Sequence, residues 1–377
     1  MLWQIFLTFA VIWLLIIRWR NRGKRQLTKI LQNDMSTLPI LGLSHQFIGS
    51  DEDRMTAISK VADEANKREG LTYIWLAHRF FCVITDAVQA EYVLKTVMEK
   101  DDILKFVRVL TGNGSIFAPV QIWRPRRKVL APTFAMRNLN QFVSIFSKQS
   151  DILVEKLAAA ANKGSFSIWK YITSYTMDSI CQTTLGTNLG IQKQPNHPFL
   201  KSFECFLELC AARILQPWLH SDFVYMFTPY YNRFIGARNF MIDFVSQIIK
   251  EKKQGLKEKK EMDKTEQGND VDDKVSAKTF LELLIESSGG DSGYTDKELQ
   301  EETMVMLLAG TDTSAVGASF ALVMLSKYPE IQEKLYQECS SPVECGWVRH
   351  PRFPVREHSR AGDPESAPTS VIARRQA

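Results

Sequence analysis

The 377-residue sequence has few cysteines and none of the common hydrolase or nucleotide-binding motifs. Its six cysteines include no Cys-x-x-Cys pair, and no Cys/His spacing fits a zinc site. A disulfide framework is therefore excluded as the basis of the fold, and a reducing compartment is favoured. The motifs G-x-S-x-G and H-E-x-x-H, the P-loop and any repeat of fixed period are also missing. No metal site is predicted from these patterns.

Acidic residues are absent from the first thirty positions, which hold six basic residues: Arg18, Arg20, Arg22, Lys24, Arg25 and Lys29. Subtracting these six from the 47 basic residues leaves 41 against 42 acidic residues, so the rest of the chain is close to neutral. A nucleic-acid-binding surface is therefore disfavoured. The chain is 45% hydrophobic and 11% aromatic, which excludes a wholly disordered, collagenous or coiled-coil protein.

The segment from Leu2 to Trp19 is almost continuously apolar. As a helix it would be about 27 Å long, enough to cross a thin bilayer such as that of the endoplasmic reticulum. A cleaved signal peptide is the alternative, but the basic residues follow the apolar run and no small-x-small cleavage site ends it. We predict a membrane anchor at residues 1–19, with the body of the chain in the cytosol because the positive charges stay on that side.

Beyond the anchor, residues 20–50 are predicted to form a basic linker ending in a Pro/Gly hinge at Leu38–Gly42. Residues 51–338 are predicted to be one domain, mainly α with a small β-sheet. Its first helix spans Asp51–Glu69 and ends at Gly70, and a hairpin follows at Leu71–Leu76 and Phe80–Thr85. The remaining predicted helices are Ala87–Thr96, Trp123–Leu130, Leu139–Ala161, Ile168–Leu185, Pro198–Leu215, Tyr231–Lys253, Ala277–Glu286, Asp296–Ser326 and Pro329–Glu338.

The composition changes abruptly near Cys339. Residues 339–377 contain six arginines, no lysine and five prolines, and they have neither helical nor strand periodicity. We predict a disordered tail that is unrelated to the preceding domain.

The segment most informative about function is the long helix predicted to begin after Thr295. Thr295 and Glu298 have the spacing of a capping box. Its centre reads Leu-Ala-Gly-Thr-Asp-Thr-Ser over residues 308–314, a polar, glycine-containing cluster that a buried helix should avoid. An acid beside an alcohol in a groove suits proton delivery to a bound reactant, and the small residues would let another group approach the backbone. The alternative is a close helix–helix crossing permitted by small residues.

A second segment of interest places Trp123 and Arg127 one helical turn apart. An indole N–H and a guanidinium on one face could bind one anionic group. The alternative is a solvated basic first turn.

In this order and spacing, these elements resemble a cytochrome P450 over roughly residues 1–338. The sequence W-R-P-R-R-K-V-L-A-P-T-F at residues 123–134 is similar to the microsomal family-4 enzymes of insects. So are Phe280–Leu284 and the following Asp296–Thr313 stretch. The resemblance implies the P450 fold, a haem cofactor, an endoplasmic reticulum membrane location, a lipophilic substrate and electrons from NADPH through NADPH–cytochrome P450 reductase.

By this resemblance, Trp123 and Arg127 would bind the haem propionates. Ala309 and Gly310 would line the groove above the iron, and Asp312 and Thr313 would deliver protons to the reacting oxygen. Family-4 enzymes often carry a glutamate at the position of Ala309 that becomes esterified to haem, so covalent haem attachment is not expected here.

The sequence departs from the family at the proximal side of the haem. A P450 needs a cysteine thiolate as iron ligand, in a Gly/Phe-containing loop that follows an E-x-x-R helix. The Gly/Phe-containing cysteine loop is missing, no E-x-x-R pattern occurs in any of the predicted helices, and Cys345 lies too soon after the long helix to serve. We therefore expect this chain, which resembles the N-terminal two-thirds of a P450, to be inactive alone. The alternative is a membrane-tethered, non-catalytic binding protein or a P450 fragment.

Overall fold

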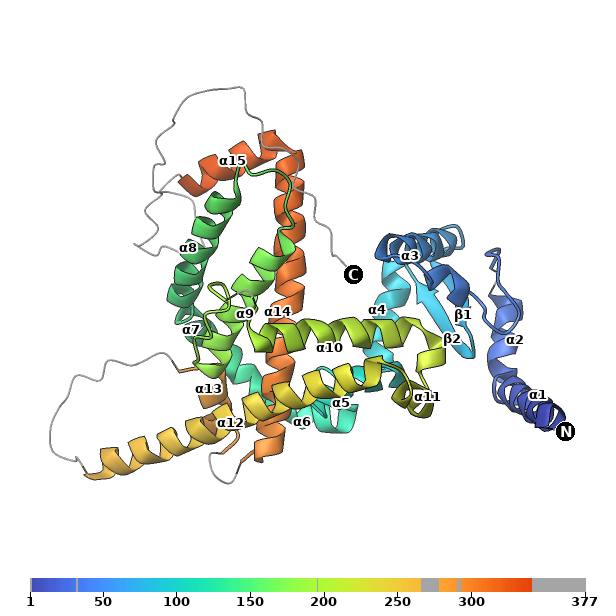
Figure 1. Ribbon diagram of the computed structural model, residues 1–377, viewed down its shortest axis with the longest axis horizontal. Helices are drawn as coiled ribbons and strands as arrows, with labels where there is room; N and C mark the ends of the chain where they lie inside the picture. The colour runs from blue at the N-terminus through green and yellow to red at the C-terminus, as the bar shows by residue number, and fades with distance from the viewer. Residues whose placement is uncertain (1, 32, 195, 266–277, 290–292, 341–377) are drawn as a thin grey trace. The chain divides into compact units, whose positions relative to one another are not determined.

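The computed structural model describes residues 2–31, 33–194, 196–265, 278–289 and 293–340 (Figure 1). The chain divides into two compact units. Unit 1 comprises Met1–Val109 and Cys205–Gly236, and unit 2 comprises Leu110–Glu204 and Ala237–Gln376. The predicted class is confirmed, because helices predominate and the described residues form one two-stranded sheet.

Unit 1 is built around a short hairpin covered by one helix. Strands β1 (Leu71–Leu76) and β2 (Arg79–Ile84) are antiparallel, with Leu71 opposite Ile84 and Leu76 opposite Arg79. The other elements of this unit are α1 (Leu2–Arg20), α2 (Arg22–Ile30), α3 (Asp51–Asn66), α4 (Ala87–Thr96), α5 (Lys105–Thr111) and α11 (Asp222–Met226). The prediction gave β1 correctly and began β2 one residue late.

Helix α3 shows why the sequence signals in unit 1 were reliable. Ser50 and Asp53 form a capping box at its N-terminus, and its apolar face contributes Ala57 and Val61 to a cluster with Leu43, Phe47 and Ile74. Gly70 closes the turn after the helix with a φ of +82°. Its N–H donates to the carbonyl oxygen of Ala65 at 2.9 Å, as expected of a glycine that ends a helix.

Unit 2 contains the long helix α14 (Asp296–Lys327), which packs along α9 (Trp169–Leu185) (Figure 1). Helix α8 (Val143–Ala160) also packs against α9. Ile168 and Ile172 meet Ala315 in the apolar contact between α9 and α14. The remaining elements are α6 (Val120–Leu130), α7 (Met136–Asn140), α13 (Phe280–Ser287) and α15 (Pro329–Ser340). Helices α10 (Pro198–Leu215) and α12 (Tyr230–Thr265) each contribute residues to both units.

Several elements differ from the prediction. Residues 20–50 contain a helix, α2, that has no buried residues and was not predicted. The first helix of the body ends at Asn66 and not at Glu69, and the predicted helix Leu139–Ala161 is two helices, α7 and α8, separated at Gln141 and Phe142. Helix α12 continues past Lys253 to Thr265 through a run of Lys and Glu, which are good helix formers.

Helix α1 is present over Leu2–Arg20, as predicted. In the part of the chain that the structure describes, the one helix that is long and apolar enough to span a membrane is α14, by length and composition only. Since α14 buries Glu301 and Glu302 inside unit 2, it has the character of a core helix. Membrane insertion of α1 stays a prediction, and the predicted tail falls almost wholly on residues 341–377, outside the described residues.

Candidate functional site

Helix α14 begins at the predicted capping box. The Thr295 N–H donates to Glu298 Oε2 at 2.9 Å, and the Glu298 N–H donates to Thr295 Oγ1 at 3.3 Å. The helix continues for 32 residues without interruption through the polar centre. The capping box therefore fixes the residue at which this helix starts. Because the helix is continuous, it also fixes how far along the helix axis residues 309–313 lie.

The polar centre of α14 brings Ala309 and Thr313 together. The Thr313 hydroxyl donates to the Ala309 carbonyl oxygen at 2.6 Å, one turn earlier. Ala309 and Asp312 are half-buried, and Thr313 is exposed. A hydroxyl bonded to the preceding turn keeps its oxygen available as an acceptor, so this face can present a hydroxyl and a carboxylate to a reactant.

Gly310 has a packing role in the structure. A Cβ at this position would lie 2.5 Å from Cδ1 and 2.8 Å from Cγ1 of Ile180 on α9. The glycine thus lets α9 and α14 approach closely, which is the alternative that the sequence left open for this residue. Its predicted place in the lining of a groove stays a prediction.

Helix α6 brings Trp123 and Arg127 together, as the one-turn spacing predicts. The Arg127 guanidinium carbon lies 5.3 Å from the centre of the Trp123 ring, within the range of a cation–π contact. Trp123 is half-buried and Arg127 is exposed. The exposed guanidinium is able to receive an anionic group beside the indole.

The residue that sequence reasoning missed is Arg126, which lies between these two in the sequence and is buried, whereas Arg127 is exposed. Its side chain is 8% exposed and meets three carboxylates of α14. Nη1 lies 2.9 Å from Glu301 Oε2 and 3.1 Å from Glu302 Oε1, and Nη2 lies 3.2 Å from Glu298 Oε1. Two adjacent glutamates directly before the apolar run Met304–Leu308 were the available signal, because acids that become buried need a cationic partner.

The loop before α6 is held by the same cluster. Arg126 Nη1 donates to the Asn113 carbonyl oxygen at 2.6 Å, and the Ser115 N–H donates to Glu302 Oε2 at 3.0 Å. At Gly114 a Cβ would lie 2.6 Å from the Glu301 carbonyl oxygen, so a side chain there would collide with the α14 backbone. These contacts join residues 112–115, α6 and α14 into one rigid group.

Arg126 and the three carboxylates that it meets, those of Glu298, Glu301 and Glu302, form the Arg126 cluster, which contains more negative than positive charge. Burial raises the pKa of Glu302 above the ordinary value of 4.5. Hydrogen bonds from Ser115 and the charge of Arg126 oppose this shift. The folded protein therefore holds the Glu302 proton more tightly than the unfolded chain does. The resulting stability is fully present below pH 4.5 and is lost as the pH rises through the raised pKa of the folded state.

We expect Glu302→Gln to remove this pH dependence. The amide oxygen can still accept from one of the two donors, Ser115 or Arg126, and the side chain carries no charge to bury. The free energy of unfolding, measured by urea titration from pH 4.5 to pH 8, should fall less steeply with rising pH in the variant than in the wild type. The groups facing Glu302 are Arg126, Glu298, Glu301 and Tyr294, all unchanged in the variant. Parallel pH profiles of the two proteins would contradict the assignment to Glu302.

Two of the five described cysteines are unsuited to be a thiolate ligand for iron. Cys181 and Cys210 are buried, and burial raises the pKa of both thiols, whereas a ligand thiol needs a lowered pKa. Cys345 lies outside the described residues. The side chains on α6 and α14 therefore fit a propionate-binding pair and a polar face, but the described donor set does not complete a haem site.

The mainly helical fold, the long core helix carrying A-G-x-D-T and the W-x-x-x-R helix agree with what the P450 resemblance predicts. The sequence model of the family described as Cytochrome P450 matches residues 34–353, and the chain belongs to this family. The match covers the region in which the motifs were recognised.

Individual relatives agree with the family-4 resemblance. The chain is 29% identical to cytochrome P450 4c21 of Blattella germanica over 342 residues, which cover 89% of this chain and 67% of the relative. It is 28% identical to cytochrome P450 4d2 of Drosophila melanogaster over 341 residues, covering 89% and 66%. With cytochrome P450 4V2 of Mus musculus the identity is 28% over 270 residues, covering 70% and 51%. The chain thus spans about two-thirds of the length of the insect relatives.

Proposed function

We propose that the chain carries the N-terminal two-thirds of a haem-thiolate monooxygenase that oxidises a lipophilic small molecule with O2. The observation that carries this proposal is the family match over residues 34–353, which contains both the α6 pair and the α14 centre. Electrons would come from NADPH through NADPH–cytochrome P450 reductase. The enzyme would be held at the endoplasmic reticulum membrane by residues 1–19, with its body in the cytosol.

The side chains on α6 and α14 have distinct proposed roles. Trp123 and Arg127 bind the haem propionates, supported by their 5.3 Å contact and the exposure of the guanidinium. Ala309 and Gly310 lie at the groove, and Asp312 and Thr313 hold and move protons at its polar face, supported by the Thr313–Ala309 hydrogen bond. The haem, when bound, supplies the oxygen-activating iron.

We further propose that the 377-residue polypeptide is inactive by itself, because its sequence lacks the Gly/Phe-containing cysteine loop that supplies the iron ligand in this family. We expect the purified chain, incubated with haemin, reduced and exposed to carbon monoxide, to show no Soret band at the thiolate-ligated position. Such a band would overturn the inactivity proposal. Specific binding of a lipophilic ligand by the haem-free chain, detected by isothermal calorimetry, would instead support the alternative of a non-catalytic binding protein.

The family role is tested separately by supplying the missing third. A chimera joins residues 1–338 to the C-terminal third of cytochrome P450 4c21, and we expect it to give the thiolate-type Soret band after reduction with carbon monoxide. In the chimera, Arg127→Met should weaken haem retention about tenfold through the loss of a charge-assisted contact to a propionate. Lys128→Met, at an exposed neighbouring position of α6, is the matched control. Equal haem retention in the two variants would contradict the role of Arg127.

A further inference from the structure

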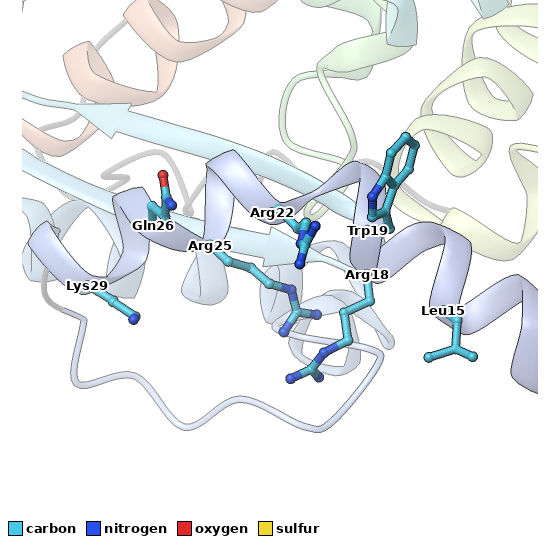
Figure 2. A pocket seen from close by; sticks show the side chains of 7 residues that line it. All are labelled: Leu15, Arg18, Trp19, Arg22, Arg25, Gln26 and Lys29. Atoms are coloured by element: carbon cyan, nitrogen blue, oxygen red, sulfur yellow. The ribbon is translucent and has the colours of Figure 1, made fainter.

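Four cations follow one side of the helical segment formed by α1 and α2. Arg18, Arg22, Arg25 and Lys29 recur at intervals of three or four residues, and all four are exposed (Figure 2). With Leu15, Trp19 and Gln26 they line a hollow of about 570 Å³. We call these four side chains the basic stripe.

The opposite side of the segment is fixed to the rest of unit 1. Asn21 is buried between α1 and α2, and its amide donates to the His78 carbonyl oxygen at 3.2 Å. After α2, the Asn33 amide donates to the Tyr73 carbonyl oxygen of β1. Because both ends of α2 are tied to the hairpin, the basic stripe has a fixed position on unit 1, and Arg18 and Arg25 also line a second hollow beside Trp75 and His78 of the hairpin.

Among the described residues, no carboxylate forms an ion pair with the stripe. The first acidic residue of the sequence is Asp34, and its side chain forms an ion pair with Arg68 of unit 1. Within the described residues, none of the four stripe cations forms an ion pair of its own. A set of four unpaired cations at fixed positions is a binding surface for anionic groups.

The apolar side chains that precede the stripe indicate which anions it meets. Ile12, Leu15 and Ile16 of α1 are at least half exposed, and Trp19, at the level of the first cations, is 67% exposed. The order along the helix is therefore apolar, then indole, then cationic. This is the order of the environments met on leaving a bilayer, from acyl chains through the interface to the phosphate groups.

We propose that the basic stripe binds the phosphate groups of anionic phospholipids and so fixes the orientation of unit 1 at the membrane. The proposal rests on the proposed membrane location and goes beyond it, because an anchor helix alone has no preference for lipid charge. In this proposal the hollow holds the lipid headgroup between the cations, and Trp19 lies beside the part of the lipid where the headgroup meets the acyl chains. The preference for anionic lipids follows because helix α2 places Arg22, Arg25 and Lys29 on one side, and the sequence analysis did not predict this helix.

The full chain is reconstituted into vesicles of phosphatidylcholine and phosphatidylserine in equal amounts, and each lipid in turn carries a spin label. Electron paramagnetic resonance then gives the relative association of the two lipids with the protein. We expect phosphatidylserine to be preferred at least about fivefold at low salt, the effect of one or more basic residues at an anionic surface. The preference should weaken at high salt.

Two variants that lose the same charge separate the stripe from net charge. The preference should disappear when the stripe is neutralised by Arg18→Gln, Arg22→Gln, Arg25→Gln and Lys29→Gln. It should persist when four exposed lysines elsewhere are neutralised by Lys60→Gln, Lys163→Gln, Lys170→Gln and Lys201→Gln. Equal behaviour of the two variants, or no preference in the wild type, overturns the proposal. If neither labelled lipid is immobilised by any protein, α1 does not enter the bilayer, and the proposed membrane location fails with it.

Discussion

Replacing Arg126 by methionine is expected to lower the free energy of unfolding by about 3–5 kcal/mol, the cost of leaving buried charges without their partner. Methionine keeps the apolar stem of the arginine but leaves the buried carboxylates of Glu301 and Glu302 without a cation. The Asn113 carbonyl oxygen also loses its donor, so the loop at residues 112–115 loses one of its hydrogen bonds to the cluster. We therefore expect faster amide hydrogen exchange in that loop as well as lower stability.

The adjacent residue provides the control. Arg127→Met removes the same charge from an exposed position of the same helix and should cost less than about 1 kcal/mol. Urea unfolding of the full chain, followed by circular dichroism, gives both values. If Arg126→Met does not fold, adding Glu301→Gln and Glu302→Gln should restore folding, because the buried charges are then removed together. Equal losses for Arg126→Met and Arg127→Met would contradict the buried cluster.

Replacing Gly310 by alanine is expected to lower the free energy of unfolding by about 1–2 kcal/mol, although alanine is the better helix former. The added methyl group would lie 2.5 Å from Cδ1 of Ile180, so α9 and α14 must separate or Ile180 must leave its rotamer. Gly317→Ala, on the same helix, should instead raise stability by about 0.5–1 kcal/mol. A Cβ at Gly317 meets no atom within 4 Å.

A double-mutant cycle tests the contact itself. Ile180→Val removes Cδ1, the atom nearest to the added methyl group, so Gly310→Ala should cost less in the Ile180→Val background than in the wild type. Thermal unfolding of the four proteins gives the coupling energy. Additive effects, or stabilisation by Gly310→Ala, would show that α9 and α14 do not meet at this glycine.

These two contacts decide what α14 presents at the candidate site. The Arg126 cluster holds the N-terminal half of the helix, and the Gly310–Ile180 contact holds its middle. Ala309 directly precedes Gly310 and Thr313 follows it three residues later, so the same packing places both. Their positions thus follow from groups that take no part in the proposed chemistry.

The sequence by itself predicted the parts of the protein that depend on residues close together in the chain. The capping box of Thr295 and Glu298, the β1–β2 hairpin and the one-turn pair of Trp123 and Arg127 are all local, and each was found where the pattern indicated it. Contacts between residues three or four positions apart are fixed by the geometry of a single helix or turn. They can therefore be predicted from the spacing of residue types in the sequence. The family motifs are of the same local kind.

Three features were decided only by the tertiary structure. Arg126 is buried while Arg127 is exposed, Gly310 allows a close contact with Ile180, and α2 is a helix held against the hairpin. Arg126 and Glu301 are 175 positions apart, and nothing in their separate surroundings shows that they meet. The stability of α2 likewise depends on contacts of Asn21 and Asn33 with distant backbone oxygens, not on an apolar face of its own. Burial of a charge or of a backbone surface is a property of the assembled chain, because it depends on which distant groups exclude water from it.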